Sequence, residues 1–281
     1  MQKSLTALFF SFLTLTLNCQ APFPDSKEIQ QFMVSKTCVV LEDGNPAYNA
    51  LIKQAVNDYW KITPFEFIKR SEFAIRKSDP SYSFLIVTET SFEKDKSTSR
   101  YNFINLIQGK KGADLNEMPE ICAFPLSFAG EDDLEYGYKI EAILSFIQKH
   151  ASLISTDPSQ TGRRYLKYYN KNIPEVGNRT ILVREEDLSP LINTIEKIKA
   201  LYKYRIEIVP EEAIIKAIKE KTPKTLVLHK VGPDPESKSG YCFKMLIGTD
   251  DNELYYYNQH LIDKTNPDGL LPADLKRLAR F

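Results

Sequence analysis

The feature of this sequence that most constrains its fold is an internal repeat. The stretch Thr37-Cys-Val-Val-Leu-Glu matches Thr180-Ile-Leu-Val-Arg-Glu, at an offset of 143 in the numbering. The stretch Tyr101-Asn-Phe-Ile-Asn-Leu-Ile matches Tyr241-Cys-Phe-Lys-Met-Leu-Ile, at an offset of 140, with Tyr, Phe, Leu and Ile at identical spacing. Two matches in the same order, at nearly the same offset, indicate that one structural unit is duplicated.

Both copies show the same order of hydrophobic patterns. Runs of four to eight β-branched and aromatic residues predict strands, and longer stretches with a 3.6-residue period predict helices. After the strand at Thr37 we expect a helix over 47–59, a strand over 65–68, a helix over 71–77, strands over 82–87, 101–107 and 121–128, and a helix over 134–154. After the strand at Thr180, the corresponding elements are expected over 188–202, 205–209, 211–220, 225–229, 241–247, 254–258 and 273–281.

These patterns predict an α/β protein of two tandem β-α-β-α-β-β(-β-α) modules with mixed sheets and helices packed on them. Right-handed crossovers between parallel strands place the helices on the faces of each sheet. The expected boundaries are a signal peptide over 1–21, a first module over 22–154, a linker over 155–178 and a second module over 179–281. The large aromatics Trp60 and Tyr202 end the first helix of each copy, and we expect both to be packed in the core.

The amino-terminal segment 1–21 predicts export. A basic start at Lys3 followed by the mostly apolar run 5–17 is typical of a secretory signal and is short for a membrane span. Three alternatives remain open: cleavage after Ala21, lipidation of Cys19, and an uncleaved amino-terminal anchor. The chain is therefore expected to be periplasmic or extracellular, with membrane attachment only if Cys19 is lipidated.

Charge and cysteine content narrow the function classes. The chain has 37 basic and 37 acidic side chains, which removes the usual electrostatic footprint of a nucleic-acid-binding protein. Outside the signal, Cys38, Cys122 and Cys242 are widely spaced and form no CxxC motif. The interpretation stays open between one disulfide with a free thiol and three buried unpaired cysteines.

Motifs that carry catalysis or cofactor binding do not occur in the sequence. Neither a Gly-rich phosphate loop, nor HExxH, nor a GxSxG elbow is present, so no catalytic, cofactor-binding or metal-binding residue is assigned. The Gly109-Lys-Lys-Gly112 segment is interpreted as a turn that follows a strand. His150 is expected at a helix end, where its charge complements the dipole, and His229 is expected as a core or edge residue.

Two aromatic segments are candidate ligand or partner surfaces. On a strand, Tyr255 and Tyr257 share one face, which places their hydroxyls near the His260 imidazole. In the linker, bases alternate with aromatics, a pattern that can hold a polyanion or stack on sugars. The linker candidates are Arg163, Arg164, Tyr165 and Tyr168.

The element order resembles that of a known type of exported module. With the pattern Trp60-x4-Phe65-Glu-Phe-Ile-x3-Glu72-Phe73 followed by Tyr82-Ser-Phe-Leu-Ile-Val, each half resembles the amino-terminal module of TolB and the related core of the curli-pore lipoprotein family. The chain is also similar to exported bacterial proteins of unknown function. The resemblance implies the module fold and location in the cell envelope, and it implies no residue roles.

The sequence therefore predicts an exported binding or scaffold protein of the cell envelope, without catalytic activity of its own. Its partner is expected to be an envelope protein or a glycan, and not a nucleic acid. Two alternatives remain: a secreted hydrolase with a scattered site that contains no motif, and a glycan- or polyanion-binding module.

Overall fold

The computed structural model describes residues 22–95, 97, 99–162, 164–233 and 237–280. The expected signal peptide, with Cys19, lies outside the described residues, and so does Arg163. Among the helices of the described ranges, none has both the length and the apolar character needed to cross a bilayer.

The first half forms a five-stranded mixed sheet in the order β2-β1-β3-β4-β5. Its strands are β1 (Lys36–Leu41), β2 (Phe65–Lys69), β3 (Tyr82–Thr90), β4 (Tyr101–Gln108) and β5 (Glu120–Phe128). β1 pairs in parallel with β2 and β3, whereas β3, β4 and β5 pair antiparallel. The parallel part is built by two crossovers, and the antiparallel part by two direct connections.

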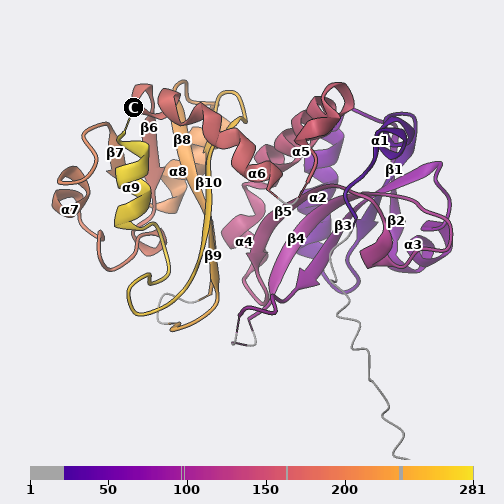
Figure 1. Cartoon of the computed structure of the whole chain (residues 1–281), viewed down its shortest axis with the longest axis horizontal. Coiled ribbons are helices and arrows are strands. Elements are labelled where there is room, and N and C mark those ends of the chain that lie inside the picture. Colours follow the sequence, from indigo (N-terminus) through magenta and orange to yellow (C-terminus); the bar gives the residue numbers. More distant parts are fainter. Residues whose placement is uncertain (1–21, 96, 98, 163, 234–236, 281) are drawn as a thin grey trace, which may run out of the picture.

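The second half repeats this topology strand for strand. Its strands are β6 (Thr180–Val183), β7 (Ile206–Ile208), β8 (Thr225–Val231), β9 (Tyr241–Gly248) and β10 (Leu254–Leu261), in the order β7-β6-β8-β9-β10. β6 pairs in parallel with β7 and β8, and the remaining pairs are antiparallel. The predicted α/β fold with two matching mixed sheets is confirmed, and Figure 1 shows the sheets side by side.

The helices of the first half include one that the sequence did not reveal. They are α1 (Ser26–Met33), α2 (Pro46–Tyr59), α3 (Arg70–Arg76), α4 (Asp133–Gly137) and α5 (Ile140–Thr156), with a 3-10 turn η1 (Leu115–Glu117). The Asp25 carboxylate caps α1 through the N–H groups of Lys27 and Glu28. The expected continuous helix over 134–154 is wrong, because α4 ends at Gly137 and the chain makes a turn over residues 138–139 before α5 begins.

The first helix of the second half is much shorter than its counterpart. The segments are η4 (Glu185–Asp187), α7 (Ile195–Lys199), α8 (Glu211–Lys219) and α9 (Pro272–Leu278). The expected helix over 188–202 is wrong at its start, because Leu188 is held in a bridge to Leu270 and precedes Pro190. The helix begins only after Thr194, whose side chain accepts a hydrogen bond from the N–H of Lys197.

The faces of the sheets on which aligned residues lie show that one of the two repeat alignments needs correction. Tyr101 and Tyr241 each begin the fourth strand of their half, as predicted from the offset of 140. The alignment of Thr37 with Thr180, at an offset of 143, is wrong by one residue. Val39 packs with α2, whereas its aligned partner Leu182 lies in the larger core with α8, on the face opposite α7. A one-residue shift reverses the face of every side chain on a strand, so Val39 corresponds to a neighbour of Leu182.

The largest core contains residues of both halves. It joins the α2 and α5 side of the first sheet to the second-sheet face that carries Phe243 and Met245. Across this contact the Phe103 and Phe243 rings meet edge to face with centroids 5.7 Å apart. His229 on β8 approaches the carbonyl of Pro125 on β5, with Nε2 3.0 Å from the oxygen. The predicted core role of His229 is confirmed, and the two halves share one hydrophobic core.

Candidate functional site

The segment between the halves is helical rather than an irregular linker. It forms η2 (Pro158–Gln160), α6 (Tyr165–Tyr168) and the ten-residue 3-10 helix η3 (Tyr169–Asn178). In Figure 1, α6 lies between the two sheets. We call residues 155–178 the connector. It covers the edges of both sheets, because β5 and β10, which end their respective sheets, both bond to it.

Tyr165 bonds the connector to the first sheet. Its hydroxyl accepts a hydrogen bond from the backbone N–H of Ala123 on β5 at 2.7 Å and donates one to the carbonyl of the same residue. The ring stacks on His150 with centroids 4.4 Å apart. Tyr165 therefore takes the place of a neighbouring strand, which is a structural role.

Two asparagines bond the connector to the second sheet. The Asn170 side chain accepts from the backbone N–H of Tyr257 at 2.7 Å and donates to its carbonyl at 3.0 Å. The Asn172 amide donates to the carbonyl of Leu254 at 2.8 Å. An unpaired sheet edge readily recruits another strand, and these side chains occupy that edge of β10.

A cleft of about 380 Å³ opens where α5, the connector and β10 meet. This volume lies in the usual range for a small-ligand site. The lining combines aromatic, amide and charged side chains from both halves: Lys149, Leu153, Tyr168, Tyr169, Lys171, Asn172, Glu175, Glu253 and Tyr255. Of the described parts of the molecule, this is where groups suited to a polar ligand gather from both halves, and we take it as the candidate site.

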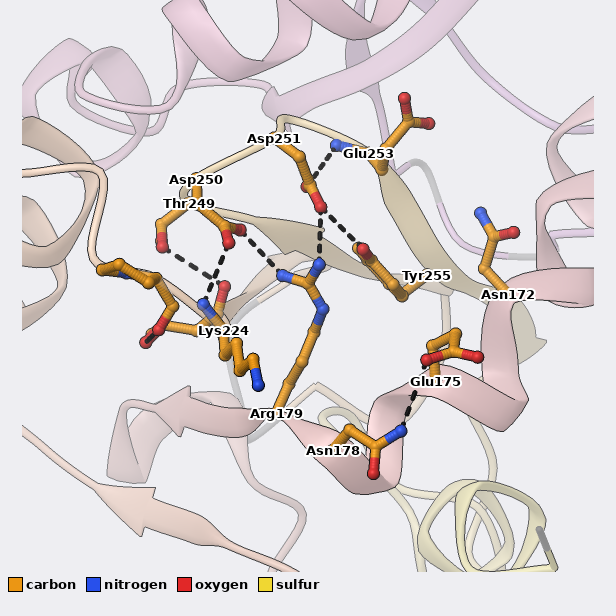
Figure 2. Close-up of polar contacts among 12 residues, drawn as sticks. Asn172, Glu175, Asn178, Arg179, Lys224, Thr249, Asp250, Asp251, Glu253 and Tyr255 are labelled. Atoms are coloured by element: carbon orange, nitrogen blue, oxygen red, sulfur yellow. Dashed lines mark hydrogen bonds and ion pairs between the residues drawn. The ribbon is translucent and has the colours of Figure 1, made fainter.

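One wall of the cleft is the ring of Tyr255. The Arg179 guanidinium lies 4.3 Å from the ring centroid and bonds to Asp250 and Asp251, each at 2.7 Å. The Tyr255 hydroxyl donates to the same Asp251 carboxylate at 2.7 Å. Figure 2 shows these bonds converging around the guanidinium. Arg179 covers one face of the ring, and the small part of Tyr255 that stays exposed, 6% of the residue, reaches the cleft.

Electrostatics hold this wall in place. Burial lowers the pKa of Arg179, but the hydrogen bond to Asp250 and the charge of Asp251 outweigh it, so the net pKa is raised. Burial, together with the hydrogen bond to Asp251, raises the pKa of Tyr255 above its usual value. Arg179 is therefore a permanent cation, and Tyr255 remains a neutral hydrogen-bond donor.

The connector and the rim of the cleft carry the other charges. The Lys171 ammonium lies 3.9 Å from the centroid of the Tyr168 ring. Across the rim, Lys149 on α5 pairs with Glu253, with Nζ 2.6 Å from Oε1, and also bonds the Asp251 carbonyl. This pair joins the first half to the β9–β10 turn of the second half.

Among the predicted site residues, the structure brings only Tyr255 and Tyr168 together in the cleft. A register shift between Leu254 and Tyr256 makes Tyr255 an extra residue in β10, so the expected alternation fails there. As a result Tyr255 packs in the core beneath the second sheet, and Tyr257 packs in the larger core. The prediction that the two tyrosines share one face is wrong.

The remaining predicted residues lie elsewhere. Register pairs Tyr257 with Met245 and His260 with Cys242, which places Tyr257 and His260 on opposite faces of the sheet. The His260 ring bonds the carbonyl of Pro267, with Nε2 3.0 Å from the oxygen. Arg164 is exposed, and Arg163 lies outside the described residues.

The sequence alone did not indicate the polar side chains in and around the cleft. Asn172 and Glu175 lie on a connector that was expected to be irregular, so no periodicity indicated a common face for them. Arg179 and Asp251 are far apart in the sequence, and a single sequence cannot show their contact. The one signal was the alternation of basic and aromatic residues over 163–171, a segment that includes Tyr168, which lines the cleft.

Reactive side chains are buried away from the cleft. Cys38, Cys122 and Cys242 are free and buried, which settles the open alternative in favour of three unpaired cysteines. Burial raises the pKa of each thiol, to about 11 for Cys38, which disfavours the nucleophilic thiolate. Within the described ranges, no group of three or more His, Cys, Asp or Glu side chains is arranged to hold a metal ion.

His150 does not have the role predicted for it. It lies inside α5, stacked on Tyr165, with Nδ1 3.0 Å from the Tyr169 hydroxyl. Burial lowers its pKa to about 3, so the ring is neutral at physiological pH. The interpretation of His150 as a cation that complements the helix dipole is therefore wrong.

Comparison with protein-family models, curated proteins and solved structures finds no match. The resemblance of each half to the TolB and curli-pore lipoprotein modules stays a prediction. What the chain does must therefore be argued from the cleft itself.

Proposed function

We propose that this chain is an exported binding protein of the cell envelope, without catalytic activity of its own, and that its ligand is a saccharide held in the cleft. The location rests on the apolar run 5–17 behind Lys3. The ligand class rests on the cleft lining, which offers three tyrosine side chains beside amide, carboxylate and ammonium groups. Sugar rings present apolar C–H faces to aromatic rings and hydroxyl groups to such polar side chains.

The observation that carries this proposal is the fixed ring of Tyr255. Its hydroxyl is bonded to Asp251, and one face of the ring lies against Arg179, so the exposed part of this mostly buried ring stays in one position and loses no side-chain freedom on binding. A rigid aromatic contributes binding area at low entropic cost. Tyr168, on the connector, supplies a second ring in the same cleft.

Charge balance argues for a saccharide over a polyanion. The four charged side chains that line the cleft are Lys149, Lys171, Glu175 and Glu253, two of each sign. Asp250 and Asp251 lie behind the Tyr255 wall and both pair with Arg179, which leaves one net negative charge there. A polyanion would meet carboxylates on entry, and the same balance speaks against a nucleic acid.

A hydrolase is the competing function that the cleft favours. Glu175 and Glu253 line the same cavity, and paired carboxylates perform glycoside hydrolysis. However, Glu253 is held by Lys149 at 2.6 Å, so it stands as half of an ion pair across the rim. We therefore assign both glutamates to ligand binding, and measurement of product formation distinguishes the two functions.

The test is binding of the chain from Pro22 onward to a panel of soluble oligosaccharides, followed by calorimetry and by product analysis of the same mixtures. We expect saturable binding without turnover, and a loss of roughly 5- to 150-fold in affinity for Tyr168→Ala, on the scale of base stacking on an aromatic ring, which is worth on the order of 1–3 kcal/mol. Tyr82→Ala is the matched control, because Tyr82 also has a cation over its ring, Arg76 at 5.4 Å, but lies in the first half. Absence of binding to every saccharide refutes the proposal, and cleavage of a bound saccharide replaces it with the hydrolase.

A further inference from the structure

The cleft contains two charges that the protein itself leaves unpaired. Lys149 is neutralised by Glu253, but Lys171 and Glu175 take part in no ion pair with any described residue. Both side chains are exposed and both line the cleft from η3. The Glu175 carboxylate accepts only a long hydrogen bond, 3.3 Å, from the Asn178 amide, as Figure 2 shows.

These two charges are of opposite sign and are separated along one wall. They lie at positions i and i+4 of η3, a 3-10 helix with about three residues per turn. The two side chains are therefore about a third of a turn apart and do not face each other as i and i+4 neighbours of an α-helix do. The Lys171 ammonium donates to the Tyr168 hydroxyl at 2.5 Å and lies 3.9 Å from the centroid of that ring, and it forms no ion pair with Glu175. The cleft therefore presents a cationic point and an anionic point on one wall, together with the rings of Tyr168 and Tyr255.

From this arrangement we infer that the saccharide bound in the cleft is zwitterionic: it carries a carboxylate that meets Lys171 and an amino group that meets Glu175. This inference rests on the proposed saccharide function and adds the charge pattern of the ligand. A neutral sugar would leave both charges without an ionic partner, whereas a purely anionic or purely cationic sugar would satisfy one charge and oppose the other.

The test uses one saccharide backbone in four charge states. A tetrasaccharide of alternating glucuronic acid and glucosamine, at mildly acidic pH where its amines are charged, is the zwitterion. Acetylation of the amines leaves only the carboxylates, reduction of the carboxylates leaves only the amines, and both treatments together give a neutral form. We expect the zwitterion to bind most tightly, with a loss of roughly two- to fivefold for each charge removed, since these are exposed pairs.

Two variants assign the charges to their partners. Lys171→Gln is expected to abolish the preference for carboxylate-bearing forms and to keep the preference for free amines, and Glu175→Gln is expected to do the reverse. The matched control is Lys216→Gln with Glu220→Gln, a pair at the same spacing, beginning on α8 and outside the cleft lining. The control is expected to leave all four affinities unchanged.

The outcomes separate this inference from the proposed function. If the four forms bind equally, the zwitterion inference is overturned and saccharide binding stands. If none of the four forms binds while other oligosaccharides do, the inference also fails alone. Binding of the free dipeptide Lys-Glu with equal affinity would show that charge alone is recognised, and it would overturn both.

Discussion

The hydroxyl of Tyr101 accepts a hydrogen bond from the backbone N–H of Tyr241, its own counterpart in the repeat, at 2.6 Å. The same ring lies edge to face against Phe243 with centroids 5.5 Å apart. Burial raises the pKa of Tyr101 to about 12, so the phenol stays protonated. The duplicated units thus meet through equivalent strand positions, and the contact lies inside the core that they share.

A shared core predicts that the two halves unfold together. We expect a single cooperative transition in urea, observed alike by circular dichroism and by the fluorescence of Trp60, which lies only in the first half. Tyr101→Phe should lower the free energy of unfolding by about 1 kcal/mol, the usual net value of one hydrogen bond, without splitting the transition. Two resolved transitions would show that the halves are independent domains.

The second prediction concerns a buried ion pair that the first half lacks. Lys244 on β9 and Asp274 on α9 are both almost fully buried, with Nζ 2.6 Å from Oδ2. The neighbouring Lys230, directly opposite Lys244 in the sheet, pairs with Asp268 at 2.5 Å. In the first half the matching cross-strand pair is Val87 and Ile104, both apolar.

We expect Asp274→Asn to destabilise the chain by about 3–5 kcal/mol, because it leaves the buried Lys244 charge without a partner. Lys244→Met added to Asp274→Asn should recover a large part of that loss, since an apolar residue occupies this position in the first half. Glu220→Gln, which breaks an exposed pair with Lys216, is the control and should change stability by less than about 0.5 kcal/mol. If the double variant is no more stable than Asp274→Asn, the unpaired Lys244 charge is not the cause of the destabilisation.

The pair also has a defined pH dependence. Burial raises the pKa of Asp274, but the charge of Lys244 and the hydrogen bonds from Tyr256 and Asn258 outweigh it and lower the net pKa below 3.8. The stabilisation is therefore complete above the unfolded pKa of about 3.9 and is lost as the pH falls through the folded value. Asp274→Asn should remove this part of the acid dependence.

The third prediction is an acid destabilisation that begins at higher pH, from His150. Its pKa falls from 6.5 to about 3 on folding, so the unfolded chain binds a proton between these values and the folded chain does not. Stability must therefore decrease as the pH falls from about 6.5 toward 3, by roughly 4–5 kcal/mol from this residue at the lower limit. The measurement is the free energy of unfolding in urea at a series of pH values.

His150→Gln should reduce the slope of the free energy of unfolding against pH by an amount that corresponds to at most one proton taken up on unfolding. The variant also loses the stacking on Tyr165, so it is expected to be less stable at neutral pH. His229, with its pKa likewise lowered to about 3 by burial, adds a second contribution of the same sign. An unchanged slope in His150→Gln would mean that the ring is protonated in the folded chain.

The sequence predicts most of the fold because strand patterns repeat. Tyr101 and Tyr241 mark equivalent strands correctly, since four matching residues at one spacing leave no freedom in register. The alignment of Thr37 with Thr180 fails by one residue, because in a fully buried parallel strand both faces are apolar and the pattern does not distinguish them.

The errors over 188–202 and in the cleft have a different cause. The start of α7 is decided by the bridge from Leu188 to Leu270, a contact distant in the sequence that overrides the local helical period. The local sequence around Lys244 does not predict its partner, because only the folded chain brings Asp274 next to it. Local patterns predict elements, whereas the cleft depends on contacts between elements, such as Arg179 with Asp251.

The fourth prediction concerns the covered edge of β10. Asn170→Ala removes both hydrogen bonds to the backbone of Tyr257 and should cost about 1–3 kcal/mol. It also frees a sheet edge, so we expect association that increases with protein concentration in sedimentation velocity. Asn178→Ala is the control, since the side chain of this exposed asparagine of the same 3-10 helix bonds the Glu175 carboxylate, at 3.3 Å, and not the sheet. Equal behaviour of the two variants would contradict the role of Asn170.

The last prediction concerns Trp60, the only tryptophan, which follows α2 at the turn into β2. It is 2% exposed, and its indole N–H donates to the Thr63 hydroxyl at 2.9 Å. Thr63 in turn bonds Thr37, so the indole ends a chain of buried hydroxyls beneath the first sheet. Its counterpart Tyr202 is fully buried, and the Tyr202 hydroxyl has no hydrogen-bond partner among the described residues.

Trp60→Ala should lower the free energy of unfolding by about 3–5 kcal/mol, the usual cost of removing a large buried ring, and should leave the Thr63 hydroxyl with one partner fewer. Trp60→Phe keeps most of the ring and should cost clearly less. Tyr202→Phe, at the matching corner of the second half, should be neutral within about 0.5 kcal/mol, because it removes only a hydroxyl that forms no bond there. Thermal melts of the three variants decide the matter. If Trp60→Ala keeps the wild-type melting temperature but no longer binds the saccharide, Trp60 belongs to the binding site and the core assignment is wrong.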